Sequence, residues 1–158
     1  MGIIFIRIDG QDYTCDKYFE VAAKNDLAGI ENHITELRQD VFGVPAINIP
    51  DDITVLNGHI GESGYVQVST FKHALIPISD VRRFKVTVNL GGWDGSQYAF
   101  VQKVTYESQQ YRYVFVSGGS RISGLPTNVQ IPEDANYLYV LLTVAGGSVH
   151  SGTVTFNK

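Results

Sequence analysis

The sequence predicts a mainly β protein. An N-terminal β-hairpin segment and a short α-helical coiled coil precede a C-terminal antiparallel β-sandwich. Apolar residues repeat with heptad spacing in residues 25–43. From residue 53 onward, short alternating runs are separated by turn residues, with no helical periodicity between them. The 16 Gly, 9 Tyr and 8 Phe residues are typical of short strands joined by tight turns.

Length, charge and cysteine content limit the class of protein. The chain has 158 residues, 44% of them hydrophobic, which suffices for one domain of ordinary size plus an appendage. No apolar run approaches the ~20 residues that span a bilayer, so we expect no membrane insertion. A net charge of −4 argues against nucleic-acid binding, which normally needs a basic face. The single cysteine, Cys15, excludes an intrachain disulfide and fits synthesis in a reducing compartment.

Residues 1–24 are expected to form an N-terminal attachment segment. A strand is predicted over residues 3–8, and Asp9-Gly10 suits a two-residue hairpin turn before a returning strand at residues 11–13. Residues 16–23 fit either a helical turn or a further extended piece. The apolar opening offers an unpaired edge that invites another chain, although an ordinary strand of a β-domain explains it nearly as well.

Residues 25–43 are predicted to be a helical oligomerisation segment. Its apolar residues step by three, four, three and four positions, which places them in one narrow seam on a helix. These seam residues are Leu27, Ile30, Ile34, Leu37 and Val41. Asn25 or Asp26 suits the N-terminal cap, whereas Gly43 and Pro45 suit the C-terminal end.

Two interpretations of the seam remain open. The helix either packs on the β-domain that follows, or forms a short parallel coiled coil between identical chains. The narrow stripe favours the coiled coil, and Leu27 at position a with Ile30 at position d favours a trimer. In a parallel arrangement Asp26 faces Glu31 across the helices, and this pair does not attract.

Residues 44–52 contain two prolines and are expected to be an extended linker, which places a β-sandwich head at residues 53–158. Asn57-Gly58 indicates a hairpin turn in the head. Strands are expected at residues 65–71, 84–90, 98–106, 111–117, 129–131 and 153–156 and at the alternating Leu138, Val140, Leu142 and Val144. Residues 91–96 are expected to be a loop.

The sequence contains no pattern that predicts catalysis, a metal site or a cofactor. Its four histidines are far apart, and it has no phosphate-binding loop and no nucleophile elbow. A glycan hydrolase needs two carboxylates across a cleft, and the candidates are Asp80, Asp94, Glu107 and Asp134. Solvated turn acids explain each of these residues better. The same holds for Asp51-Asp52 and Glu133-Asp134 as calcium ligands.

Trp93 and Asp94 are the candidate glycan-binding residues. The lone tryptophan lies among Gly91, Gly92 and Gly95, in a loop that cannot easily bury an indole. An exposed aromatic face beside a carboxylate suits a sugar, because C–H groups stack on the ring while the acid accepts hydroxyl hydrogen bonds. The alternative is that Trp93 folds back as a plug at the end of the sandwich, since tryptophan is often highly buried.

Two stretches resemble a known family. VAAKNDLAGIENHITEL in residues 21–37 resembles the short helical connectors of bacteriophage fibre proteins. The C-terminal half resembles the small jelly-roll-like sandwiches at the ends of phage fibres and baseplate proteins. The motif there is an aromatic strand at residues 113–117, Ile122-Ser123-Gly124, and IPEDANYLYV in residues 131–140, with Pro132 and Ala135 in structural roles.

The resemblance implies a virion structural protein, made in the host cytoplasm. It would be a short homotrimeric fibre of the phage head or tail. Residues 1–24 would dock to a capsid or tail protein, and the head is a candidate for adhesion to host-surface glycan. Two alternatives from other classes are a free-standing carbohydrate-binding module and, less favoured, a small glycan hydrolase. The oligomeric state distinguishes the fibre from the free-standing module, because a lectin module does not need residues 25–43.

Overall fold

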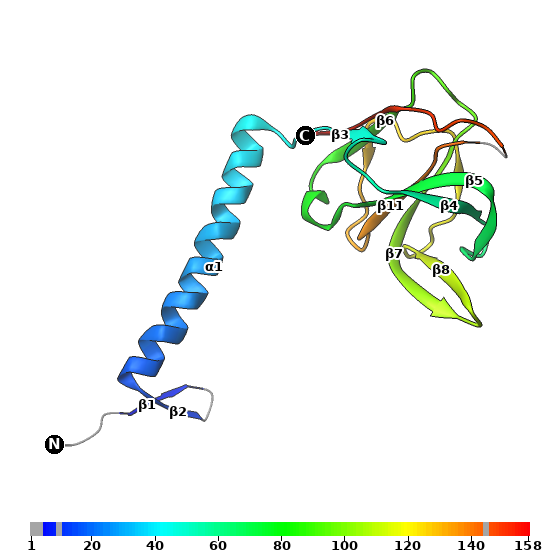
Figure 1. Cartoon of the computed structure of the whole chain (residues 1–158). Coiled ribbons are helices and arrows are strands. Elements are labelled where there is room, and N and C mark those ends of the chain that lie inside the picture. The colour runs from blue at the N-terminus through cyan, green and yellow to red at the C-terminus, as the bar shows by residue number, and fades with distance from the viewer. Residues whose placement is uncertain (1–4, 9–10, 144–145) are drawn as a thin grey trace. The chain divides into compact units, whose positions relative to one another are not determined.

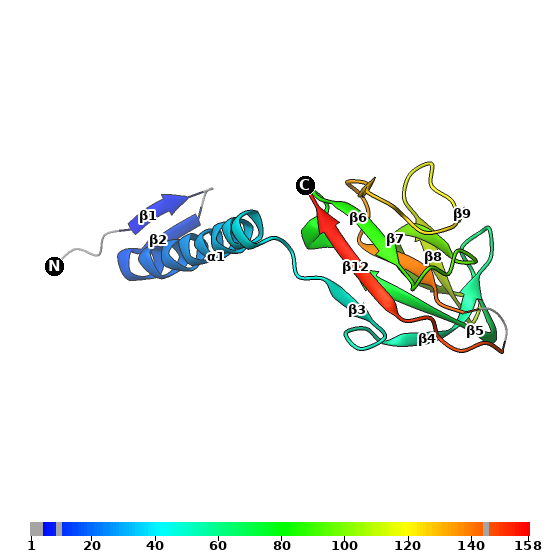
Figure 2. The same cartoon turned by 90° about the horizontal axis from the view of Figure 1, so that it is seen from above.

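The computed structural model describes residues 5–8, 11–143 and 146–158, with side chains from Asp26 onward (Figures 1 and 2). The chain divides into two compact units, Met1–Gly43 and Val44–Lys158. The second unit therefore begins at the start of the predicted linker, not after it.

The first unit contains a β-hairpin and one helix. Strands β1 (Phe5–Ile8) and β2 (Gln11–Thr14) pair antiparallel, with Phe5 opposite Thr14. This confirms the predicted N-terminal hairpin, whereas its turn dipeptide Asp9-Gly10 lies outside the described residues.

Helix α1 (Cys15–Phe42) starts earlier than predicted. Residues 16–23 are helical, so neither Asn25 nor Asp26 caps the N-terminus. The reason is that this stretch is rich in residues with high helix propensity, among them Ala22 and Ala23. The C-terminal end agrees with the prediction: Gly43 has φ = 77°, and its N–H donates to the carbonyl oxygen of Gln39 at 2.9 Å.

The predicted linker, residues 44–52, contains a strand. Strand β3 (Ile47–Ile49) pairs with β12 (Gly152–Asn157) at the edge of a sheet, and Ile49 is only 2% exposed. In the turn that follows, the Asp52 carboxylate accepts from the backbone N–H of Asn48 at 2.7 Å and from its side-chain amide at 2.8 Å. A three-residue strand between two prolines is too short for its alternation to be recognised in the sequence.

The second unit consists of two antiparallel sheets in an open, sandwich-like arrangement, which Figure 2 shows with β3, β12 and β6 side by side. The four-stranded sheet has the order β10 (Val129–Gln130), β6 (Lys85–Asn89), β12, β3. The six-stranded sheet has the order β4 (Val55–Ile60), β5 (Val66–Pro77), β11 (Tyr137–Leu141), β7 (Gln97–Glu107), β8 (Gln110–Phe115), and β9 (Ile122–Ser123) also pairs with β7. A 3₁₀ turn (Ser79–Val81) follows β5. The mainly-β, sandwich-like prediction is confirmed at this level.

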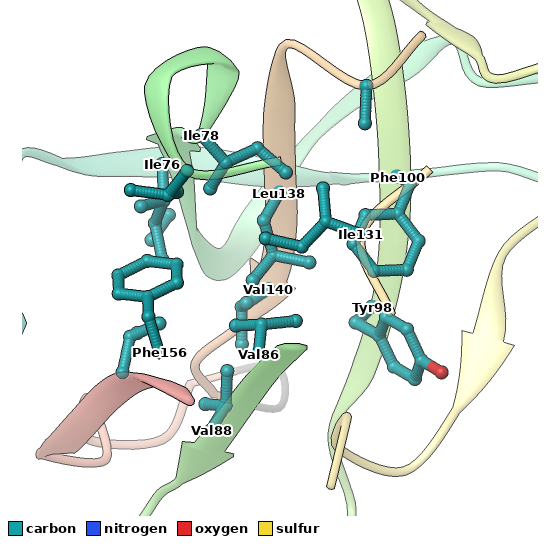
Figure 3. Packing of buried hydrophobic residues seen from close by; sticks show 14 of the residues in the cluster. Ile76, Ile78, Val86, Val88, Tyr98, Phe100, Ile131, Leu138, Val140 and Phe156 are labelled. Carbon is teal, nitrogen blue, oxygen red and sulfur yellow. The ribbon is translucent and has the colours of Figure 1, made fainter. Parts of the chain in front are cut away.

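The main hydrophobic core lies between the two sheets (Figure 3). The six-stranded sheet contributes Ile76, Phe100 and Leu138, and the four-stranded sheet contributes Val86 and Phe156. The alternation predicted for residues 84–90 is therefore correct, because its apolar face lines this core. Phe84, Val86, Val88 and Leu90 are all buried.

A second core lies on the other face of the six-stranded sheet. It contains Ala99, Val101, Tyr139 and Leu141, which alternate along β7 and β11 with residues of the main core. The predicted alternation of Leu138, Val140 and Leu142 is thus only part of the pattern, since the residues between them are buried as well. Val144, the last residue of that predicted strand, lies outside the described residues.

The second core is covered because the six-stranded sheet curls. The N–H of Tyr113 in β8 donates to the carbonyl oxygen of Gly64 at 2.8 Å, and Tyr65 forms a bridge with Arg112. The start of β5 thus meets β8, although β11 and β7 separate these strands in the sheet order. This curl encloses the side chains between them.

Asn57-Gly58 is not a hairpin turn, contrary to the prediction. It lies inside β4, where the pairing with β5 shifts between Asn57 and His59. Gly58 has φ = 96°, and a Cβ atom there would lie 2.5 Å from the carbonyl oxygen of Gln67. The dipeptide therefore forms a bulge, because positive φ and lack of a side chain serve a bulge as well as a turn. The chain reverses at residues 61–65, where Gly61 N–H donates to Tyr65 O at 3.0 Å.

The buried position of Ala135 leads to a stability prediction. Ala135 is fully buried in the main core, in the turn that enters β11, and Ala135 N–H donates to Pro132 O at 3.1 Å. Ala135→Leu should lower the free energy of unfolding by ~1–3 kcal/mol, because the added atoms have no space. The matched control is Ala46→Leu at an exposed position. Equal urea midpoints for the two variants would show that Ala135 is not packed as described.

Candidate functional site

The five predicted seam residues all lie exposed on α1. Their exposed fractions run from 44% for Ile34 to 70% for Val41, and Phe42 at the end of the helix is 85% exposed. Since these positions share one helix face, they form a continuous apolar stripe. A contiguous apolar patch of this kind is typical of a protein–protein interaction site.

Trp93 is neither fully exposed nor a buried plug. It is half-buried in the loop between β6 and β7, and it packs against the edges of both hydrophobic cores. Its indole stacks on the imidazole of His150, with ring centroids 4.2 Å apart and an interplanar angle of 6°. A Cβ atom at Gly95 would lie 2.8 Å from the indole Nε1, so glycine is needed there to let the loop pass the ring.

Trp93 and Asp94, the two residues predicted to bind glycan, line one groove. The groove has a volume of about 420 Å³, and its wall also carries the polar side chains Thr87, Asn89 and Thr127. The Asp94 side chain is exposed, and within the described part of the chain it has no hydrogen-bond or ion-pair partner. A groove with an aromatic ring, a carboxylate, an amide and two hydroxyls offers the groups that a sugar needs.

The other candidate acids do not join Asp94. Asp134 accepts from the backbone N–H of Ser117 at 3.0 Å, and Glu107 accepts from the Thr105 hydroxyl at 2.7 Å. Asp52 stabilises the turn after β3. In the described residues no group of three or more metal-ligating side chains comes together. No described helix is both long and apolar enough to cross a membrane.

A second hollow, which the sequence analysis did not predict, lies on the curled side of the six-stranded sheet. Its volume is about 390 Å³. Most of its wall is apolar, and it comes from strands β4, β5, β7 and β8. The lining residues are Leu56, Asn57, Val66, His73, Leu75, Val104, Tyr111 and Tyr113.

His73 and Tyr113 form a hydrogen-bonded polar pair in the wall of this hollow, to which Asn57 adds a further polar side chain. His73 is 1% exposed, with its Nδ1 2.8 Å from the carbonyl oxygen of Gly58 and its Nε2 2.8 Å from the hydroxyl of Tyr113. Because a carbonyl oxygen can only accept, Nδ1 carries the proton and donates. The Gly58 bulge places this carbonyl oxygen over the histidine, which links the unusual backbone of β4 to the hollow.

Burial keeps these groups uncharged. It lowers the pKa of His73, and the nearby His59 lowers it further, against the opposing effect of the Gly58 hydrogen bond. Burial also raises the pKa of Tyr113 to about 12. In a neutral imidazole protonated at Nδ1, Nε2 is an acceptor, so the Tyr113 hydroxyl donates to it. The Tyr113 oxygen can then act towards other groups only as a hydrogen-bond acceptor.

The sequence contained a sign of this hollow. His73 and Leu75 alternate with Ala74 and Ile76 near the end of β5, so this part of the strand has an apolar side chain on each face and no exposed polar one. A strand without a polar face is covered on both sides. The spacing of the histidines does not reveal the hollow, because His73 pairs with a tyrosine far along the chain.

Comparisons of the chain with protein families, with curated proteins and with solved structures each found no match. The function is therefore argued from the geometry of the described residues.

The burial of His73 predicts how stability depends on pH. Because the folded state holds the pKa of His73 below 6.5, the unfolded chain binds the extra proton first. The stabilising contribution is complete above about pH 6.5 and is lost as the pH falls below that value. As the pH falls below about 6.5, His73→Gln should lose less unfolding free energy than the wild type. Denaturant titrations at several pH values measure this difference.

His33→Gln, at an exposed position of α1, is the matched control and should keep the wild-type dependence. Parallel pH curves for wild type and His73→Gln would contradict the assignment of a neutral, buried His73.

Proposed function

We propose that the protein is a virion structural protein, a short homotrimeric fibre of a bacteriophage head or tail. The observation that carries this proposal is the exposed apolar seam of α1, a helix of 28 residues. An isolated helix gains little stability in water without tertiary contacts, and an exposed a/d stripe is best buried against copies of itself. The residues at the first a and d positions of the seam favour a coiled coil of three helices.

The remaining parts of the chain have roles consistent with a fibre. The N-terminal segment, residues 1–24, which contains the hairpin strands and the first turns of α1, would dock to a capsid or tail protein, and α1 would set the threefold symmetry as a parallel coiled coil. The sandwich, which we propose is jelly-roll-like, would face outward as the head. Such a protein is made in the host cytoplasm and located in the virion.

The head is proposed to bind host-surface glycan through Trp93 and Asp94. The groove of about 420 Å³ beside them supports this, since its wall combines one aromatic ring with several hydrogen-bonding side chains. The same observation supports the second candidate function, a free-standing carbohydrate-binding module. A glycan hydrolase has less support, because Asp94 is the only acid among the residues that line the groove and hydrolysis normally requires two.

The seam makes a direct prediction about oligomeric state. Wild-type protein should be a trimer by light scattering. Ile30→Asp with Ile34→Asp should give a monomer with an intact β-sheet circular dichroism signal, because unpaired charge is costly in a buried seam. The control Asn32→Asp with Thr35→Asp adds the same charge on the outer face of α1 and should stay trimeric. A trimeric seam variant, or a monomeric wild type, would contradict the fibre proposal and favour the free-standing module.

The groove makes a prediction about binding. Host-surface polysaccharide should shift the emission of Trp93, the one tryptophan of the chain, to the blue as the ring loses water. Trp93→Ala and Asp94→Ala should each weaken binding in calorimetry by roughly tenfold or more, since each removes one main interaction. Asp80→Ala, an exposed acid that does not line the groove, should bind like the wild type. Equal affinity for all four proteins would place the glycan elsewhere or rule it out.

A further inference from the structure

The hollow around His73 and Tyr113 lies apart from the groove of Trp93, and the two share no lining residue. We propose that this hollow binds a small molecule with an apolar, two-ring aromatic body and one hydrogen-bond donor, of the type of indole. The site is separate from the proposed roles of α1 and of the Trp93 groove, and its tests do not depend on them.

The wall of the hollow selects an apolar ligand. Leu56, Val66, Leu75 and Val104 supply aliphatic surface, and Tyr111 adds an aromatic ring. The polar lining residues are Asn57, His73 and the two tyrosines, so a sugar would bring most of its hydroxyl groups against aliphatic side chains that cannot hydrogen-bond with them. Burying a polar group without a hydrogen-bond partner is unfavourable, so this wall disfavours sugars. The hollow thus differs from the Trp93 groove in the class of ligand that it accepts.

Its polar groups define what the ligand must carry. The Tyr113 hydroxyl donates its hydrogen bond to His73 Nε2. Its oxygen can therefore only accept a hydrogen bond from a ligand in the hollow. The carbonyl oxygen of Gly58 accepts a hydrogen bond from His73 Nδ1, which fixes the imidazole in the tautomer protonated at Nδ1. The ligand therefore needs a donor, an N–H or an O–H, at the Tyr113 oxygen. A fixed acceptor of this kind rejects an isosteric molecule that has no donor.

The size of the hollow sets the ligand's dimensions. An apolar protein cavity of about 150 Å³ accommodates a benzene molecule, and the hollow has about 390 Å³. A two-ring body fits this volume with room for a substituent. The volume also lies within the ordinary range of small-molecule sites, which is roughly 300–1,000 Å³.

The mouth of the hollow continues as an aromatic surface. Val104 and Tyr106 lie opposite Tyr113 and Tyr111 in the β7–β8 pairing, so all four side chains share one face of the hairpin. The rings of Tyr106 and Tyr111 meet edge to face, with centroids 5.0 Å apart, and both tyrosines are exposed. Exposed apolar side chains at the open side give a ring a surface to contact as it enters.

The first experiment compares two isosteric probes on the full chain. Indole and benzofuran have the same shape, but only indole has an N–H donor. Titration followed by ligand-observed NMR should show saturable binding of indole, with benzofuran roughly tenfold weaker because it leaves the Tyr113 oxygen without a partner. In Tyr113→Phe, indole should bind no better than benzofuran, whereas the affinity of benzofuran should stay unchanged.

The second experiment blocks the mouth without touching the core. Val104 is 37% exposed and lines the hollow, so Val104→Trp should fill it and abolish the binding of both probes. Val68 is 96% exposed on β5 and does not line the hollow, so Val68→Trp is the matched control and should bind like the wild type. The circular dichroism of both variants should match that of the wild type, which keeps the comparison valid even if Tyr113→Phe fails to fold.

Three results would overturn the proposal. These are the absence of saturable indole binding, equal affinity for indole and benzofuran, and binding that persists in Val104→Trp. None of them bears on the trimer or on glycan binding, because neither Val104 nor Tyr113 belongs to the seam or to the Trp93 groove.

Discussion

The pairing of β11 between β5 and β7 is the interaction on which the β-domain depends. Leu138 lies opposite Ile76 on one side and Phe100 on the other, so three strands contribute to the main core at one level of the sheet. Tyr139 lies opposite Leu75 and Ala99 and brings the same three strands into the second core. A single strand thus carries both cores, and a one-residue slip in its register would exchange their residues.

Two irregularities in the six-stranded sheet create the hollow on its curled side. The pairing of β7 with β8 shifts between Val101 and Lys103, and the pairing of β4 with β5 shifts at Gly58. The first shift brings Val104 to the face that Val101 occupies, and the second directs a carbonyl oxygen at His73. Bulges bend and twist a sheet, and here they combine the bend with a polar site in an apolar surface.

The two units of the chain present different kinds of surface. The described side chains of α1 form an apolar stripe suited to another helix, whereas the β-domain buries most of its large apolar residues and offers two hollows. One hollow has hydrogen-bonding groups around Trp93, and the other has a mostly apolar wall around the hydrogen-bonded pair of His73 and Tyr113. This difference in chemistry is why we assign assembly to the helix and two distinct ligand classes to the β-domain.

The sequence alone determined the class of the fold, because its evidence is local. Heptad spacing identified the helix and its seam, Gly43 identified the C-terminal end of the helix, and alternation identified strands such as β6. Trp93 and Asp94 line the same groove because adjacent residues of one loop lie close together, but the groove itself was not predicted. Local patterns predicted the boundaries of helices and strands less well. Helix α1 starts earlier than predicted, and residues 44–52 contain a strand that was not predicted.

Tertiary structure alone decided the features that depend on contacts between distant residues. The stack of Trp93 on His150 joins two loops, and the hydrogen bond of His73 to Tyr113 joins β5 to β8 across the curl of a sheet. Asn57-Gly58 has the composition of a turn, and only its pairing with β5 makes it a bulge. A sequence specifies which conformations a residue tolerates, whereas the position of a distant strand determines which of them is used.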